Sequence, residues 1–316
     1  MPSVDTSVPS ASIAADSFRV RSARRWRRMR RRSTPYLFLT PFLIGFAVFF
    51  IFPLIYALNL SIFRTKIVGG RTFVGLDNYV RAFQDPTFWT GIRNVLSFGV
   101  IQVPVMLGLA LAAALLLDSG IIRRQSVMRL AYFLPFAVPG VVAALLWGYL
   151  YGQRFGPIAQ IARGLGLAPP QFLTQGAIIP ALANIATWQY TGYNMLIMYA
   201  ALKAIPPELY EAARVDGASG LQIARSIRIP LILPAILLTF IVSILGTLQL
   251  FSEPQILGTI APSAVGPNFT PNLYVYTLAF QNRQFDYSAA IAFSLAIVTA
   301  VLSALVLVFV YRRARV

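Results

Sequence analysis

Apolar side chains gather in six long runs, and polar connections separate these runs along the chain. The runs cover about residues 36–62, 94–117, 130–151, 177–202, 231–250 and 287–311. None of them contains Asp, Glu, Lys or Arg. About 20 apolar residues are enough for a helix to cross the hydrocarbon core of a bilayer. The pattern therefore predicts an all-α polytopic membrane protein with six transmembrane helices.

The composition supports a lipid environment and removes several classes of chemistry. Apolar residues make up 57% of the chain, charged residues 12%, and the mean hydropathy is +0.68. Soluble domains carry about 25% charged residues. The sequence has no Cys and no His, so it offers no disulfide framework, no histidine metal site and no histidine catalytic triad.

The basic residues predict the orientation of the chain in the membrane. The net charge is +17, and 19 of the 27 basic residues lie before the first run, after the last run, or in the second-to-third and fourth-to-fifth connections. Lys and Arg concentrate in cytoplasmic loops, so both termini are predicted to be cytoplasmic. Nucleic-acid binding is the rival explanation for so basic a chain, and we reject it because the arginines lie where the topology requires them.

Two parts of unequal length are expected. Residues 1–35 form an Arg-rich cytoplasmic segment whose beginning, rich in Ser, Ala and Pro, is predicted to be disordered. Its arginines serve as a topology anchor or bind anionic lipid headgroups. Residues 36–316 form the transmembrane domain. The first apolar run is too long for a cleaved signal peptide.

The third run carries a predicted break. Pro135, Pro139 and Gly140 lie close together in it. Proline removes a backbone donor and kinks a helix, and in lipid the freed carbonyl needs another partner. The break is either an adaptation of packing or part of a transport pathway, and the sequence leaves both open.

The connection 203–230 is predicted to form a helical hairpin at the cytoplasmic surface. Glu208 follows two prolines and suits the first turn of a helix, and Gly217 suits its end. Ser219 is expected to cap a second short helix, which Pro230 should stop. An ordinary amphipathic connector is the alternative to a docking element.

The spacing within this connection decides between these alternatives. Glu211, Ala212 and Ala213 are followed after three residues by Gly217, and then after nine by the sequence Ile-Arg-Ile-Pro, which ends at Pro230. This pattern resembles the signature of ABC-importer membrane subunits, with Ile229 where the family has Leu. The sequences 74–79 and 134–139 are similar to the carbohydrate-uptake branch, the latter to the larger membrane subunit of the maltose importer. The resemblance covers about residues 35–316.

The resemblance implies a type I ABC-importer permease fold and a set of partners. A second, usually different, permease subunit would complete the pathway, two copies of a cytoplasmic ATPase would bind ATP and Mg²⁺, and an extracytoplasmic solute-binding protein would deliver a sugar or related polyol. The residues that couple this chain to the ATPase would be Glu208, Glu211, Ala212, Ala213, Asp216 and Gly217. The location implied is the cytoplasmic (inner) membrane of a prokaryote.

No enzyme activity, cofactor, metal or nucleic acid is expected for this chain itself. Lys66 and Lys203 are the only lysines and neither follows glycine, so the sequence lacks a Walker A loop. ATP hydrolysis is accordingly expected in a separate subunit.

The resemblance also implies a substrate site. The positions carried over from the maltose subunit are Phe136, Gly140, Gln189, Tyr190, Ser243, Thr247 and Leu250. Phe136 and Leu250 replace more polar residues, which argues against maltose itself. The alternatives are that Ser243 and Thr247 bond only to their own helix, that the partner subunit alone holds the substrate, or that the substrate is glycerol phosphate or another non-sugar compound.

An ion-coupled secondary transporter is the leading rival function. Such coupling usually needs a buried acid or His at membrane depth. Here Glu253 and Asp286 lie at or beyond the ends of the runs. A membrane enzyme is a weaker rival, because the lack of His and Cys leaves few ways to build a nucleophile with its base.

Overall fold

A computed structural model describes residues 36–66 and 69–314, with side chains as far as residue 308. The chain divides into two compact units, one ending at Asn59 and the other beginning at Leu60. The segment 1–35, for which the sequence predicts disorder, lies outside the described residues.

The first apolar run forms a helix, Tyr36–Ser61, as predicted. A π-helical turn, η1 (Ala47–Ile51), interrupts it before α2 (Phe52–Ser61). Phe42, Phe46 and Phe50 stack along one face, with ring centroids 6.0 Å and 5.0 Å apart. Residues four apart are neighbours on a helix surface, so this stacking follows from the sequence spacing.

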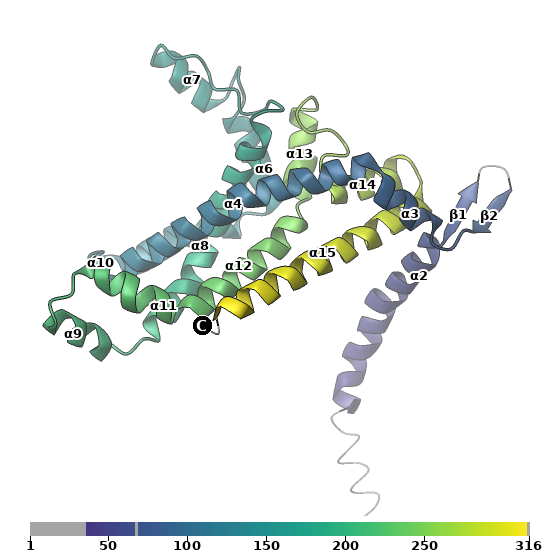
Figure 1. The fold of residues 1–316 in the computed structure, drawn as a ribbon. Coiled ribbons are helices and arrows are strands. Elements are labelled where there is room, and N and C mark those ends of the chain that lie inside the picture. The colour runs from purple at the N-terminus through teal and green to yellow at the C-terminus, as the bar shows by residue number, and fades with distance from the viewer. Residues whose placement is uncertain (1–35, 67–68, 315–316) are drawn as a thin grey trace, which may run out of the picture. The chain divides into compact units, whose positions relative to one another are not determined.

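Long helices lie side by side in the second unit: α4 (Pro86–Asp118), α8 (Ile178–Lys203), α12 (Leu233–Leu248) and α15 (Phe285–Ala314) (Figure 1). Small residues let α4 and α8 approach closely. Ala110 and Ala114 of α4 are fully buried in one cluster with Met195 and Met198 of α8. Small side chains at helix contacts are typical of membrane proteins, where close packing replaces the hydrophobic effect.

The third run is broken at the predicted place. The helix α5 (Gln125–Phe133) continues as a 3₁₀ turn, η2 (Leu134–Ala137), and α6 (Gly140–Leu150) leaves at an angle of 96°. The break falls at Val138 and Pro139, whose backbones are extended. A fixed proline φ and a missing N–H account for the loss of helical hydrogen bonds there.

A glycine brings α5 against α8. A Cβ atom at Gly192 would overlap the backbone carbonyl oxygen of Tyr132. Because Gly192 has no side chain, the broken helix packs directly on the backbone of α8.

Three helices of the described residues are long and apolar enough to span a membrane, or up to five if each bent pair counts as one span. The second bent pair is 220–231 with 233–248, at 65°. The helix α8 has 26 residues but carries several amides and hydroxyls, which lower its hydropathy. The six runs thus correspond to helical segments, and the count of six spans stays a prediction.

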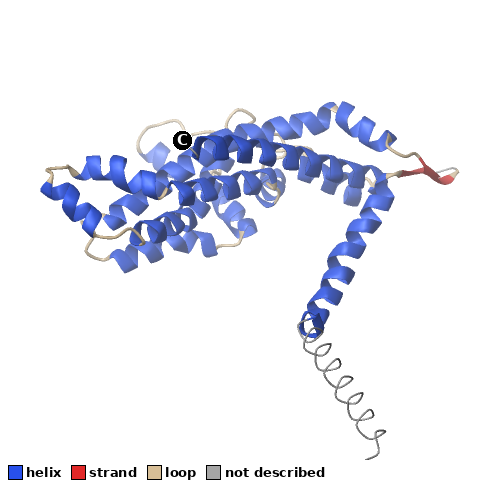
Figure 2. Ribbon diagram, turned by 60° about the horizontal axis from the view of Figure 1, so that its bottom comes forward, coloured by secondary structure: helices blue, strands red, loops and turns tan. Residues whose placement is uncertain are grey.

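The connections hold structure that the sequence pattern did not predict. Two short antiparallel strands, β1 (Phe63–Lys66) and β2 (Gly70–Phe73), pair in the first connection (Figure 2). Short helices fill the other connections: α7 (Pro157–Gly164), α13 (Ser252–Ile260) and α14 (Pro271–Tyr276), which continues as η4 (Thr277–Gln281). The first connection also holds a short helix, α3 (Asp77–Gln84), which has Leu76 as its N-cap and Asp77 in its first turn.

A carboxylate fixes the beginning of α4. Asp85 accepts a hydrogen bond from the backbone N–H of Thr87 at 2.8 Å, and the hydroxyls of Tyr274 and Tyr287 donate to its other oxygen at 2.7 and 2.8 Å. Burial alone would raise the pKa of Asp85, but these hydrogen bonds together lower it. This contact ties α4, α14 and α15 together at the end of the unit opposite the 203–230 connection (Figure 1).

Candidate functional site

The first half of the 203–230 connection is a short helix, α9 (Glu208–Val215). Glu208 and Glu211 lie in its first turn, where negative charge offsets the helix dipole. Gly217 follows with φ +80°, a left-handed conformation that side chains with a Cβ rarely adopt. The predicted helix and its glycine stop are confirmed.

The two faces of α9 differ. Glu208, Glu211, Ala212 and Val215 recur at helical spacing and are all exposed, Val215 to 88%. The opposite face, with Tyr210 and Ala213, is half-buried against the rest of the unit. The outer face therefore offers two carboxylates beside small and apolar side chains, with nothing in the described chain covering them.

The second half of the hairpin is one bent helical path. Ser219 and Gln222 form a capping box at α10 (Gly220–Ile223), which confirms Ser219 as a cap. A π-helical turn, η3 (Ala224–Arg228), and α11 (Ile229–Leu231) follow. The expectation that Pro230 ends this helix was wrong. The wider π turn places Pro230 at the start of a new turn, where its missing N–H is not needed, and the 65° bend comes after α11.

A buried carboxylate joins both ends of the hairpin to α4. Asp118, the last residue of α4, has a side chain only 4% exposed. One of its oxygens lies 2.9 Å from Nζ of Lys203, the last residue of α8, and the other lies 3.2 Å from Nε of Arg228. The Arg228 contact is an ion pair without a well-aligned hydrogen bond.

Arg228 also touches α9. Its guanidinium carbon lies 4.8 Å from the ring centroid of Tyr210, which is a cation–π distance. Burial raises the pKa of the Tyr210 hydroxyl, and the negative charge of Asp118 adds to that effect. The chain Asp118–Arg228–Tyr210 thus leads from the end of α4 to the inner face of α9.

A second group of predicted site residues meets at the broken helix. The ring of Phe136 lies 5.9 Å from that of Tyr190 and stacks on Tyr193 at 4.7 Å. The amide of Gln189 donates to the carbonyl of Val138 at 2.7 Å. Gln189 thereby satisfies a backbone acceptor freed by the break. Its own amide oxygen is buried and without a hydrogen-bond partner in the described chain.

Glu253 of α13 reaches the same place. Its side-chain oxygen lies 2.9 Å from where a Cβ atom of Gly140 would be. Glu253 is 9% exposed, and no Lys or Arg of the described chain pairs with it. Burial raises the pKa of Glu253.

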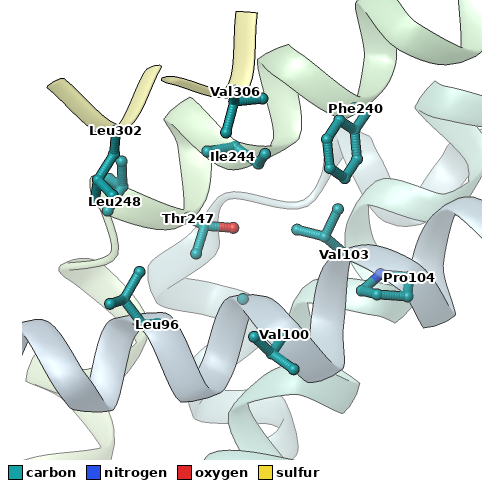
Figure 3. A pocket seen from close by; sticks show the side chains of 11 residues that line it. Leu96, Val100, Val103, Pro104, Phe240, Ile244, Thr247, Leu248, Leu302 and Val306 are labelled. Atoms are coloured by element: carbon teal, nitrogen blue, oxygen red, sulfur yellow. The ribbon is translucent and has the colours of Figure 1, made fainter. Parts of the chain in front are cut away.

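The remaining predicted substrate residues are Ser243, Thr247 and Leu250. The hydroxyl of Thr247 donates to the backbone carbonyl of Ser243, and that of Ser243 to the carbonyl of Thr239. Thr247 faces an apolar cavity of about 320 Å³ between α4, α12 and α15, and is its only hydroxyl-bearing residue (Figure 3). Leu250 is buried in an apolar cluster against which Val138, at the break in the third run, also packs. The role of these three residues in substrate binding stays a prediction.

The sequence pattern missed Asp118 and Glu253 as site residues, although it contained a signal for each. Asp118 is the only acidic residue between Asp85 and Glu208. Glu253 is the only charged residue between Arg228 and Arg283. An isolated charge in so apolar a sequence is costly, which makes it a functional candidate.

Comparison with known proteins places this arrangement in a family. Residues 104–315 match the family model described as binding-protein-dependent transport system inner membrane component. The chain belongs to this family. It is a permease subunit of a binding-protein-dependent ABC importer and resides in the inner membrane.

Several characterised permeases resemble this permease along most of its length. The lactose transport system permease protein LacF of Rhizobium radiobacter is 33% identical, over 85% of this chain and 91% of that protein. The arabinooligosaccharides transport system permease protein AraP of Bacillus subtilis (strain 168) is 31% identical, over 86% and 87%. The diacetylchitobiose uptake system permease protein NgcF of Streptomyces coelicolor is 32% identical, over 95% and 90%.

Solved structures share the permease fold. A chain of a bacterial alginate ABC transporter, crystallised with an alginate pentasaccharide-bound periplasmic protein, matches with a TM-score of 0.78 and 23% identity. The match covers 92% of this chain and 96% of that one. A second structure of a bacterial ABC transporter for alginate import gives the same TM-score at 24% identity. These likenesses establish the type I ABC-importer permease fold.

Proposed function

We propose that this permease subunit imports a neutral saccharide or polyol, using ATP that is hydrolysed with Mg²⁺ in a separate cytoplasmic ATPase present in two copies. A second permease subunit completes the pathway, and an extracytoplasmic binding protein delivers the substrate. The chain itself binds no cofactor.

The observation that carries the proposal is the outer face of α9. A helix that exposes Glu208, Glu211, Ala212 and Val215 together suits a groove lined by apolar and basic side chains. Gly217 turns the chain sharply behind this face. Asp216, at the C-cap of α9, is exposed beside it. These residues would dock in the ATPase, and nucleotide-driven motion of the ATPase would push the hairpin.

The proposed orientation has six spans with both termini cytoplasmic. The hairpin α9–α11, the end of α4 and the C-terminal end of α15 lie at the same end of the second unit (Figure 1). The basic residues that favour the cytoplasmic side belong to these same connections. The fourth span would be α8, which the packing of α4 against it supports.

The substrate class follows from the relatives and from one carboxylate. Relatives that transport lactose, arabinooligosaccharides and diacetylchitobiose favour a saccharide. Phe136, Tyr190 and Tyr193 provide aromatic faces at the broken helix. Glu253, with no basic partner in the described chain, would accept hydrogen bonds from hydroxyls and repel phosphate esters or uronic acids. This argues for a neutral substrate over glycerol phosphate.

Uptake by the reconstituted transporter tests the proposal. The permease, the second subunit, the ATPase and the binding protein are placed in proteoliposomes, and radiolabelled lactose, arabinotriose, diacetylchitobiose and glycerol 3-phosphate are offered separately. At least one neutral sugar should accumulate only with ATP, and glycerol 3-phosphate should not. Glu211→Lys should abolish uptake without affecting membrane insertion.

Two results would overturn the proposal. Uptake that stops when ion gradients are collapsed, while ATP stays high, would indicate an ion-coupled secondary transporter. Normal uptake by Glu211→Lys would remove α9 as the coupling element. A matched variant, Arg154→Glu, reverses a charge in the connection before α7 and should leave uptake unchanged.

A further inference from the structure

Asp118 makes a contact pattern that sequence spacing alone does not suggest. Lys203 precedes the hairpin and Arg228 lies near its end, so 24 residues separate the two cations along the chain. Both nevertheless meet the same carboxylate, one on each oxygen. The carboxylate itself belongs to α4, which is far from both in sequence.

The burial of these groups argues for a fixed contact. The side chains of Asp118 and Arg228 are 4% and 9% exposed, while that of Lys203 is 49% exposed. Surface ion pairs contribute little, but a buried ion that loses its partner is strongly unfavourable. The Asp118–Arg228 pair is therefore the firm contact, and Lys203 is the more accessible one.

The neighbouring aromatic residues extend the contact in two directions. Arg228 lies against Tyr210 of α9. Nζ of Lys203 lies 5.3 Å from the ring centroid of Tyr199 of α8, and the guanidinium of Arg129, on α5, lies 5.5 Å from the same ring. The broken helix thus begins beside the same cluster of charges.

We propose that Asp118 is a positioning residue that clamps both ends of the 203–230 hairpin to α4, so that hairpin, α4 and α8 move as one body. The inference rests on the proposed function, because it assigns to this clamp the transfer of ATPase motion from α9 to the long helices. Without the clamp, α9 still docks in the ATPase, but the hairpin moves independently of α4 and α8. The displacement of α9 then does not reach these helices.

The experiment uses the assembled transporter and asks whether the ATPase responds to the binding protein. The probe is a mixture of lactose, arabinotriose and diacetylchitobiose, added with the binding protein. In Asp118→Asn, stimulation of ATP hydrolysis by the loaded binding protein should fall by about tenfold. Single mutations between two coupled sites change the coupling by amounts of this order. Basal hydrolysis and co-purification with the ATPase should remain. Asp118→Glu, which keeps the charge, should recover part of the response.

A distance measurement separates positioning from a merely structural role. The chain has no Cys, so spin labels can be attached through Leu116→Cys on α4 and Leu209→Cys on α9, both exposed sites outside the face proposed to dock in the ATPase. A clamped hairpin should give one narrow distance distribution with and without ATP. Arg228→Met and Lys203→Met each remove one cation, and the distribution should broaden, more so for Arg228→Met.

The controls keep the inference separate from the proposed function. Asp77→Asn changes an exposed acid of α3 and should leave stimulation and distances unchanged. If Asp118→Asn does not assemble, the distance distributions of Arg228→Met and Lys203→Met test the clamp instead. Unchanged distributions in both, or a stimulated rate equal to wild type in Asp118→Asn, would overturn the clamp. The variant Glu211→Lys tests the proposed function separately. If it is inactive in the same assays, the proposed function stands even when the clamp is overturned.

Discussion

The hairpin end and the broken-helix end of this permease each contain one buried carboxylate, and the two differ in their partners. Asp118 is held between two cations, Lys203 and Arg228. Glu253 pairs with no cation of the described chain and lies instead against Gly140, at the start of α6. A carboxylate whose two oxygens are both occupied fixes structure, whereas one without a counter-ion keeps the capacity to bind.

The two ends therefore suit different tasks. The hairpin end carries paired charges, a capped helix and a glycine turn, all of which hold a fixed shape. The broken-helix end carries aromatic faces and a carboxylate whose charge is costly to bury. We infer that force enters at the first end and substrate selection occurs at the second.

Loss of the glycine turn should have the largest effect on function. Gly217→Val forces a β-branched residue to φ +80°, which costs at least about 1–2 kcal/mol and reorients α9. ATP-driven uptake should fall to background while the protein still inserts. Gly220→Val is the matched control, because Gly220 has equal space and no left-handed backbone. Equal uptake by the two variants would contradict the assigned role of the turn.

Separating the broken helix from α8 should have the next largest effect. Gly192→Ala places a methyl group against the carbonyl of Tyr132, and overpacking of this kind costs about 1–3 kcal/mol. The melting temperature in detergent should fall and sugar-stimulated hydrolysis should weaken. Gly246→Ala on α12 has open space and should change neither quantity. A melting temperature unaffected by Gly192→Ala would show that the contact is not tight.

The charge of Glu253 should affect stability in a pH-dependent way. Burial raises its pKa above the usual 4.5, so the folded protein favours the protonated form. The contribution of Glu253 to the free energy of unfolding is therefore most favourable below pH 4.5 and declines as the pH rises through the raised pKa. Glu253→Gln should melt higher than wild type at pH 7.5, and the difference should vanish near pH 4.

The same variant also tests substrate selection. Glu253→Gln should keep uptake of the neutral sugar within about threefold, since an amide still offers hydrogen bonds. Competition by a uronic-acid analogue of that sugar should increase, because the repelling charge is gone. If the acidic analogue competes equally in wild type and variant, Glu253 does not select against anions.

The smallest effect is expected at Thr247. Its hydroxyl is already bonded to its own helix, and the other residues that line the same cavity are apolar. Thr247→Val should change KM for the sugar by less than about twofold, whereas Tyr190→Ala, at the aromatic cluster, should raise KM clearly more. If both variants raise KM equally and strongly, Thr247 and Tyr190 would belong to the same substrate site.

Much of this fold could be predicted from the sequence because lipid imposes a simple pattern. The six apolar runs, the break at Pro135–Pro139, the helix ending before Gly217 and the cap at Ser219 each depend on local chemistry. The strands β1 and β2 and the helices α13 and α14 were missed, because their short segments lack a period that can be recognised.

The site was only partly predictable, for a different reason. The hairpin residues share one sequence motif, so their grouping could be seen. The Asp118–Lys203–Arg228 contact joins residues that are distant in sequence, and no local rule pairs them. Glu253 appeared to lie beyond a span, yet α13 folds back along α6 and brings it to Gly140. In both cases the isolated charge was the available signal.

Cross-linking in the assembled transporter tests the central claim most directly. Because the chain has no Cys, a single cysteine with a photoreactive maleimide reports one position. Glu211→Cys, on the outer face of α9, should cross-link to the ATPase subunit with high yield, and Gln160→Cys, exposed on α7, should not. No cross-link from position 211 in a transporter that imports sugar, or an equal yield from position 160, would contradict the account.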